Sequence, residues 1–358
     1  MTLRRAPSLT VAMDDTTHET PATARLAGPV IDCQWHWYPR VVLEALTTRT
    51  SHPRTHRAGD GYVLEATPSE SWEYPEHYVD LDRQLAIMDE SGIDTVIASP
   101  VVAADVSALE IGAARELCEL FNEELAGAQR QHRGRLYGLA TLPVQDTAAA
   151  IDCLDDAIDR LGLVGALLHS NVDGGSIAAP EMWPLYARLA ERGVPLFLHP
   201  TRTFAPERFH DFALEPPLGY MFDTTVAATS LIVSGVLDAY PDLQVVHPHL
   251  GAALPVLVDR LDVYRRLGRW DAPRPLSEYL PRFHTDTVSE SPRALRMALE
   301  VYGPERVLFA SDFPYFPPAD GVRFAREHVA PEQADAIFSG NAARLLGLEV
   351  TAEVGVRG

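Results

Sequence analysis

The stretch LQVVHPHLGAALPVLVDRL, residues 243–261, contains the unit from which we derive the fold. It begins with an apolar run that is too short for a helix and that ends at His247 and His249. Apolar residues then recur at the spacing of one helical face, at Leu254, Leu257, Val258 and Leu261. The stretch therefore predicts a buried strand followed by a helix, with polar side chains where the strand ends.

The same unit repeats along the chain. Eight apolar runs alternate with amphipathic stretches, at residues 30–35, 95–101, 136–142, 165–170, 195–200, 243–248, 283–288 and 306–312. Short runs rich in Val, Ile, Leu and Ala are expected of strands buried on both faces. Eight such strands with helical crossovers predict an α/β fold, the (β/α)8 TIM barrel. A doubly wound open sheet is the alternative, but no glycine-rich phosphate turn follows the first run.

Both ends of the chain and one connection fall outside this repeat. Residues 1–28 lack the apolar core of a signal peptide and predict a disordered leader, and residues 350–358 predict a C-terminal tail. The barrel is therefore expected over residues 29–349. Residues 41–80 separate the first strand from its helix, and loops this long are usually functional or disordered. We expect a lid over the active site, with a surface excursion or a dimer contact as the alternative.

The composition excludes several classes of protein. The 358 residues include 30 arginines, no lysine and 50 acidic residues, for a formal net charge of −20. P-loop and Schiff-base enzymes need a lysine, as do metal centres bridged by a carbamylated lysine. The negative charge argues against nucleic acid as a partner. No apolar run reaches the roughly 18 residues of a transmembrane helix, and three scattered cysteines suit a reducing, cytoplasmic compartment.

Polar side chains gather at the ends of the predicted strands, where a barrel carries its chemistry. Period-two alternation places Asp32, Gln34 and His36 on one face of the first strand and Cys33 and Trp35 on the other. Later strands end at His169, His199, His247, His249, Asp286 and Asp312. Imidazole and carboxylate groups together suit Zn²⁺, Mn²⁺ or Fe²⁺, and three protein ligands leave a position open for catalysis. We expect such a site where His36, His199, His249 and Asp312 converge.

Five motifs are distributed along the predicted barrel. They are LAIMDESGIDTVIAS at 85–99, PLFLHP at 195–200, SGVLDAYPDLQVVHPHLGAALP at 234–255, RVLFASDFPY at 306–315 and GNAARLLGL at 340–348. With them the chain resembles the amidohydrolase superfamily, in the branch of 2-amino-3-carboxymuconate-6-semialdehyde decarboxylase. The resemblance implies that His36, His199 and Asp312 bind a divalent metal. It also implies that His249 acts as general acid or base, with Asp312 as a second catalytic residue.

Gln34 departs from the pattern of this branch, which normally has a histidine or glutamate ligand at the same position. A glutamine offers only a neutral carbonyl oxygen, a weak donor for a transition metal. Three interpretations follow. The metal stays on the other three ligands with Gln34 as a weak or outer-shell partner, the enzyme works without metal, or the site is inactive and binds a molecule.

Members of this branch act on carboxylated aromatics, unsaturated acids and lactones. The resemblance therefore implies a metal-assisted decarboxylase of an aromatic or unsaturated acid, with zinc as the first expected metal and manganese or iron as alternatives. A hydrolase of a lactone, amide or C–C bond, with or without metal, is a second hypothesis. A catalytically decayed barrel used for binding is a third. The resemblance also implies a homodimer.

A carboxylated substrate needs a specific cation in a chain this acidic, because the net charge would not draw in an anion. Arginine recognises carboxylate with two parallel hydrogen bonds, and Arg202, three residues after His199, is the first candidate. Further contacts to substrate are expected from Trp37, His169 and His247. Asp286 is expected to orient a histidine from outside the ligand set.

Overall fold

The computed structural model describes residues 28–67, 70–100, 105–203, 208–209 and 211–349. Apart from Gly28, the predicted leader and tail lie outside these residues. The eight predicted strands all form, as one parallel sheet in the order β1-β5-β6-β7-β10-β11-β12-β13. They are β1 Ile31–His36, β5 Thr95–Ser99, β6 Leu136–Ala140, β7 Gly165–His169, β10 Leu196–His199, β11 Val245–Val246, β12 Phe283–Asp286 and β13 Val307–Leu308.

The sheet closes through a seam between β1 and the chain at and after β13. The backbone N–H of Cys33 donates to the carbonyl oxygen of Phe309 at 2.9 Å, and the N–H of His36 donates to that of Phe313 at 2.8 Å. Trp35 and Phe313 also form a parallel bridge. The predicted (β/α)8 barrel is therefore confirmed, and the carboxyl ends of all eight strands meet at one mouth.

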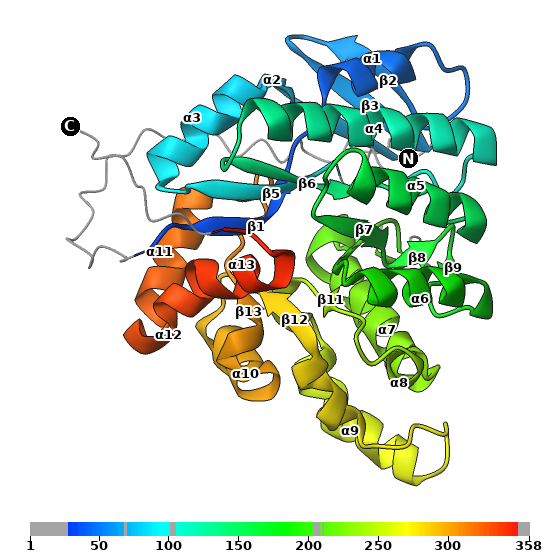
Figure 1. Ribbon diagram of the computed structural model, residues 1–358, viewed down its shortest axis with the longest axis vertical. Coiled ribbons are helices and arrows are strands. Elements are labelled where there is room, and N and C mark those ends of the chain that lie inside the picture. Colours follow the sequence, from blue (N-terminus) through cyan, green and yellow to red (C-terminus); the bar gives the residue numbers. More distant parts are fainter. Residues whose placement is uncertain (1–27, 68–69, 101–104, 204–207, 210, 350–358) are drawn as a thin grey trace.

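Helices surround the barrel (Figure 1). The longer ones are α3 Leu81–Ser91, α4 Ile111–Gln131, α5 Thr147–Asp159, α6 Trp183–Arg192, α7 Tyr220–Val233, α9 Leu254–Arg266, α10 Pro292–Tyr302 and α11 Pro318–His328. Short helices α8 Val236–Ala239, α12 Pro331–Asp335 and α13 Asn341–Leu346 complete the ring. Side chains cap the amino ends of four of them, from Asp80, Glu110, Asp146 and Ser291. Gly92 and Gly193 end α3 and α6 in the left-handed conformation, which glycine adopts without strain.

Each barrel strand buries both of its faces. Inward side chains line a central cavity, among them Leu139, Leu167 and Phe197. Outward side chains such as Leu168 and Leu196 pack in a second apolar layer beneath the helices. This double burial explains why the strands are continuous apolar runs rather than alternating ones.

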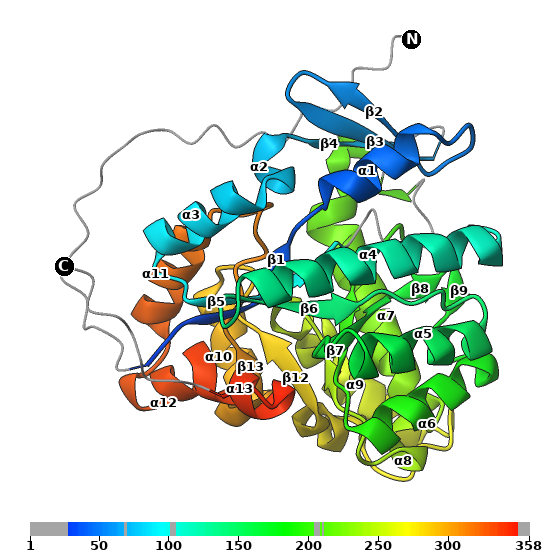
Figure 2. The same cartoon turned by 45° about the horizontal axis from the view of Figure 1, so that its top comes forward.

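The segment between the first strand and its helix is folded. It contains α1 Arg40–Thr47, an antiparallel sheet of β2 Arg54–Ala58, β3 Gly61–Thr67 and β4 Glu70–Tyr74, and the short helix α2 Glu76–Val79. Figures 1 and 2 both place this sheet outside the barrel, at the end to which β1 leads. Tyr74 and Tyr78 of this segment pack against Tyr38, which follows β1. The insertion therefore contacts the mouth of the barrel, and its role as a lid stays a prediction.

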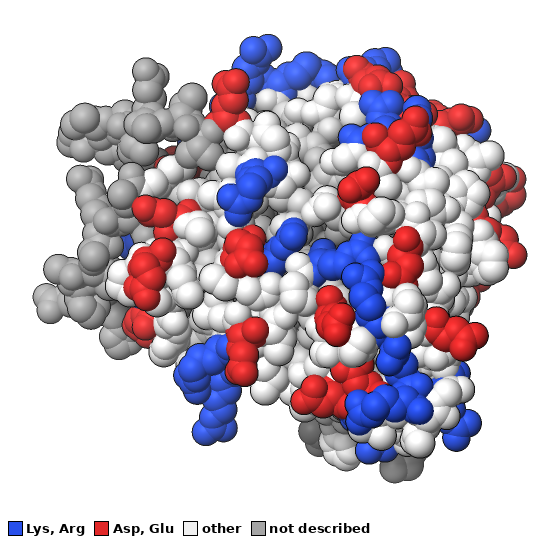
Figure 3. All heavy atoms as spheres, turned by 60° about the horizontal axis from the view of Figure 1, so that its bottom comes forward, with Lys and Arg blue, Asp and Glu red and all other residues white. Residues whose placement is uncertain are grey.

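Several arginines on the surface are paired with acidic residues. Arg160 binds Asp156 at 2.7 Å, and Arg188 binds Asp155 at 2.9 Å. Figure 3 shows basic and acidic side chains interleaved over one face of the molecule. Among the helices in the described ranges, none combines the length and the apolar character needed to cross a membrane.

Candidate active site

The polar side chains of the first strand reach the cavity because the strand pairs irregularly with its neighbour. The pairing of β1 with β5 shifts between Asp32 and Trp35, which accommodates an extra residue as a β-bulge does. As a result Cys33, Gln34 and His36 all line the cavity inside the barrel, whereas Asp32 bonds across the seam to the chain after β13. The predicted division of this strand into two faces is therefore wrong, because the bulge resets the period of two.

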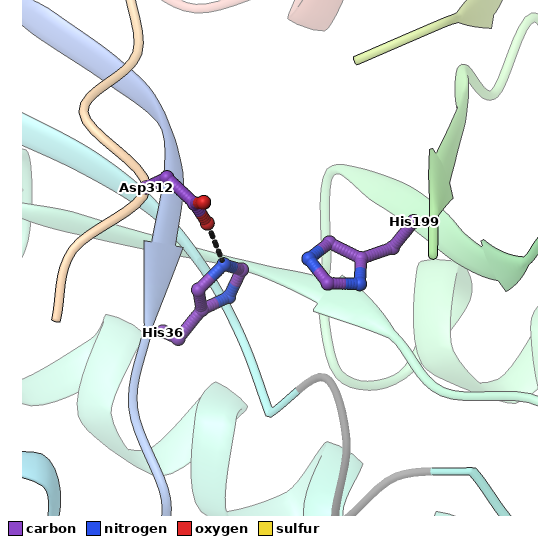
Figure 4. A group of neighbouring side chains, drawn as sticks. All are labelled: His36, His199 and Asp312. Atoms are coloured by element: carbon purple, nitrogen blue, oxygen red, sulfur yellow. Dashed lines mark hydrogen bonds and ion pairs between the residues drawn. The ribbon is translucent and has the colours of Figure 1, made fainter. Parts of the chain in front are cut away.

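His36, His199 and Asp312 form a compact group at the mouth. They come from the ends of β1 and β10 and from the chain after β13, and one donor atom of each lies within 4.8 Å of the others. His36 Nε2 is 2.9 Å from Asp312 Oδ1. Figure 4 shows the three side chains pointing toward one another. The structure thus brings together the three residues that were expected to bind metal.

Backbone carbonyl groups orient both imidazoles of this group. His199 Nδ1 lies 2.7 Å from the carbonyl oxygen of Pro200, and His36 Nδ1 lies 3.3 Å from that of Ser99. A carbonyl oxygen only accepts hydrogen bonds, so Nδ1 carries the proton and the Nε2 lone pair remains for a ligand. His36 Nε2 and Asp312 Oδ1, 2.9 Å apart, therefore suit either a cation between them or a proton on Nε2. Two neutral imidazoles and one carboxylate fit a divalent metal in an open site.

Burial and neighbouring charges reinforce this arrangement. Burial lowers the pKa of His199 well below its ordinary value, and the nearby His36 lowers it further, so the ring stays neutral. Burial alone would raise the pKa of Asp312, but its interactions with His249 and His36 outweigh burial and lower the pKa. A neutral imidazole and an ionised carboxylate are the forms that bind metal.

His249 approaches the same carboxylate from the turn that follows β11. Its Nε2 lies 3.7 Å from Asp312 Oδ2, and its backbone has a φ of 58° in the left-handed region. Such a conformation is strained for a residue with a side chain, and Asp286 holds it by accepting the N–H of His249 at 2.8 Å. Burial would lower the pKa of His249, but Asp312 and Asp286 outweigh it and raise the pKa. Asp286 thus contacts the backbone of the histidine rather than its ring.

Two of the expected substrate contacts lie near this group. The ring of His169 stands edge-on to that of His199, with centroids 6.5 Å apart. Arg202 is partly exposed, and its Nη2 lies 3.7 Å from Asp173 Oδ1. His169 is the last residue of β7, and Arg202 lies on the turn that follows β10.

The other two expected contacts are turned away from the cavity. Trp37 packs in the main apolar core and donates its indole N–H to the carbonyl oxygen of Val79 at 3.0 Å. His247 is fully buried beside Phe283 and Tyr302, and burial lowers its pKa to about 3. Neither residue lines the described cavity. The left-handed turn at His249 breaks the strand alternation, so His249 reaches Asp312 while His247 stays in the core.

Sequence reasoning missed a group of tyrosines beside the site. The Tyr315 ring lies 5.7 Å from that of His36, and its hydroxyl is 2.7 Å from that of Tyr38. Tyr78 of the insertion stands edge-on to Tyr315, with centroids 6.1 Å apart. Burial, together with the charge of Asp312, raises the pKa of Tyr78 to about 12, so its phenol keeps its proton. The spacing of Tyr38, Tyr78 and Tyr315 in the sequence does not predict this group, because the residues meet only where the barrel closes.

The fold and the site define a (β/α)8 barrel with a candidate mononuclear metal centre at its carboxyl mouth. A family model described as Amidohydrolase matches residues 31–348. The chain belongs to the amidohydrolase family. The resemblance to this superfamily is therefore confirmed, and the chain is an amidohydrolase-related enzyme.

Curated relatives of this chain are decarboxylases. The gamma-resorcylate decarboxylase of Rhodococcus jostii (strain RHA1) is 30% identical over 295 residues, which cover 76% of this chain and 88% of the relative. The 2-amino-3-carboxymuconate-6-semialdehyde decarboxylase of Dictyostelium discoideum is 25% identical over 298 residues, which cover 81% of each chain. These relatives confirm the expected branch and favour a carboxy-lyase over a hydrolase.

Solved structures give the same result. The 5-carboxyvanillate decarboxylase of Sphingomonas paucimobilis superposes with a TM-score of 0.79 at 27% identity, over 90% of this chain and 99% of that protein. The 5-carboxyvanillate decarboxylase of Novosphingobium aromaticivorans, solved with manganese and a nitrobenzoic acid, has a TM-score of 0.77 at 24% identity, over 91% and 98%. The second likeness establishes the shared fold, and the manganese belongs to that protein.

Proposed function

We propose that this protein is a divalent-metal-assisted decarboxylase of a hydroxylated aromatic carboxylic acid. The observation that carries the proposal is the convergence of His36, His199 and Asp312 at a barrel mouth with His249 beside them. The relatives named above act on such acids or on an unsaturated carboxylic acid. A bound divalent cation would supply positive charge that orients the substrate and stabilises negative charge as it develops.

The side chains of the site have separate roles in the proposed reaction. His36, His199 and Asp312 would hold the cation, while His249 keeps a proton beside the substrate. His249 would transfer this proton to the ring carbon that bears the carboxylate, after which the C–C bond electrons return to the ring and CO2 leaves. Proton uptake from solvent would restore His249.

Recognition of the carboxylated substrate would come from the rim of the mouth. Arg202 is the proposed partner of an anionic group, because it lies on the turn after His199 and its side chain is partly exposed. His169 would donate or accept a hydrogen bond from the same side. The insertion at 41–80 would act as the lid, with Tyr78 as its contact to the site.

We also propose the identity of the metal and the cellular location of the protein. The donor set of two imidazoles and one carboxylate suits zinc, manganese or iron, and zinc remains our first choice. Three free cysteines support a reducing, cytoplasmic location. We also propose a homodimer, which sedimentation in solution would test.

Product analysis in D2O tests the proposed reaction. The metal-loaded protein is incubated with gamma-resorcylate and with 5-carboxyvanillate, and CO2 and the aromatic product are measured. We expect CO2 and one deuterium at the carbon that lost its carboxylate. Hydrolysis of lactones or amides by the same preparation, without CO2 from any acid, would overturn the proposal in favour of a hydrolase.

A further inference from the structure

The side-chain amide of Gln34 contacts both residues that flank the proposed metal position. Its Nε2 donates to Asp312 Oδ1 at 2.9 Å and lies 3.4 Å from His249 Nε2. With the NH2 end toward Asp312 the amide donates to the carboxylate, whereas the opposite orientation would set its carbonyl oxygen against the carboxylate unless a cation lay between them. An amide NH2 group donates hydrogen bonds and offers no lone pair to a metal.

The backbone of Gln34 is also hydrogen-bonded to Asp312. Its carbonyl oxygen accepts the N–H of Asp312 at 2.9 Å, across the seam where the barrel closes. Asp312 has a φ of 62°, a left-handed conformation that needs support from its surroundings. On the other side, the N–H of Gln34 donates to Asp32 Oδ1 at 3.1 Å. Gln34 therefore fixes both the backbone and the side chain of Asp312.

A neutral residue at position 34 also sets the charge of the site. With Gln34, the cation and its ligands carry one more positive charge than the same group would with a glutamate at this position. The site is buried, so a unit of charge acts strongly on a substrate anion there. The neutral amide thus favours a carboxylate substrate at the expense of affinity for the cation.

Building on the metal-assisted function proposed above, we infer that Gln34 is a positioning residue and not a metal ligand. Its amide holds Asp312, one of three protein ligands of the cation, and lies 3.4 Å from His249 Nε2. Gln34, the residue that departs from the branch pattern, would then position the catalytic group and leave the site active.

The test compares Gln34→Leu with Gln34→Glu in the full chain. Mn²⁺ affinity is measured by competition with a chelator, ligand geometry by the visible spectrum of the Co²⁺-loaded protein, and turnover with a carboxylated aromatic substrate. We expect Gln34→Leu to leave the Co²⁺ spectrum unchanged, while kcat falls about 10- to 100-fold. Gln34→Glu should bind Mn²⁺ at least roughly tenfold more tightly, change the Co²⁺ spectrum and raise KM, because a carboxylate is a better ligand than an amide.

The outcomes separate this inference from the proposed function. A changed Co²⁺ spectrum in Gln34→Leu would show that Gln34 is a ligand, because loss of an outer-shell contact can by itself weaken Mn²⁺ binding about 10- to 100-fold. An unchanged kcat would show that Gln34 positions nothing. If the natural protein and His199→Ala bind Mn²⁺ equally poorly, the metal-assisted function itself fails. Gln34→Met, with a similar shape and no donor, replaces Gln34→Leu if thermal unfolding shows that the leucine variant does not fold.

Discussion

The Nδ1 atom of His199 lies 2.7 Å from the carbonyl oxygen of Pro200, the next residue in the chain. The backbone at the end of β10 thereby orients the imidazole of His199. The proton is held at Nδ1, and the Nε2 lone pair is available to a metal bound between His36, His199 and Asp312. No distant residue is needed for this contact, so the orientation of the ring follows from the local path of the chain.

We predict that His199→Ala loses the metal. Removal of one of three ligands leaves too few donors for a stable site, so metal content should fall from about one ion per chain to well below it, and activity with it. Elemental analysis of protein purified without chelator measures the change. His169→Ala is the control, since its ring contacts His199 from outside the donor group and should leave the metal in place.

Replacement of His249 should affect turnover but not metal content. The imidazole lies 3.7 Å from Asp312 without belonging to the donor group. His249→Gln should lower kcat by about 10²- to 10⁴-fold, the usual contribution of a general acid or base. Steady-state kinetics combined with elemental analysis measures both quantities. Metal loss in this variant would instead identify His249 as a ligand.

Replacement of Arg202 should weaken binding of the carboxylated substrate. Arg202→Ala removes a guanidinium group that can form two parallel hydrogen bonds to a carboxylate, so KM should rise by roughly tenfold or more with little change in metal content. Arg188→Ala, which removes an arginine paired with Asp155 on the surface, serves as the control. Equal KM values for the two variants would exclude Arg202 from the substrate site.

Asp32 should make the protein less stable as pH rises. Burial raises its pKa to about 7 in the folded protein, from an ordinary value of 3.8, so the folded state binds the extra proton between these values. The free energy of unfolding therefore falls with rising pH across this window, by up to about 1.4 kcal/mol per pH unit from this group. Asp32→Asn keeps a carbonyl oxygen for the N–H groups of Gln34 and Ser311 and an NH2 group for the Ser311 hydroxyl.

Denaturant unfolding of Asp32→Asn at pH 4 to 8 measures this effect. The variant should lose much of the pH dependence and be more stable than the natural protein near pH 8. Asp82→Asn, on the exposed face of α3, should leave the pH profile unchanged. A variant profile parallel to that of the natural protein would contradict the prediction.

Gly251 allows Tyr302 to pack against the turn that carries His249. A Cβ atom at Gly251 would lie 2.1 Å from the Tyr302 hydroxyl, and its φ is 76°. Gly251→Ala should therefore destabilise the fold by roughly 2 kcal/mol or more and lower kcat by displacing His249. Gly268→Ala is the matched control, because its φ of 74° is similar but no atom lies within 4 Å of its Cβ position. Similar unfolding free energies for both variants would show that only the backbone conformation matters.

The sequence by itself determined the barrel and the three residues of the candidate metal group. Apolar runs fix which segments are strands buried on both faces, and helical spacing fixes the crossovers between them. His36, His199 and Asp312 lie at strand ends, and the ends of parallel strands meet at one mouth whatever the details of packing.

Only the tertiary structure decided which other side chains reach that mouth. Alternation is a local rule that holds while strand pairing is regular, and here a bulge turns Cys33 inward beside Gln34. A left-handed turn held by Asp286 separates His249 from His247. Contacts far apart in the chain maintain both irregularities, because backbone strain persists only where the surrounding structure supports it. The spacing of residues along one strand therefore could not predict them.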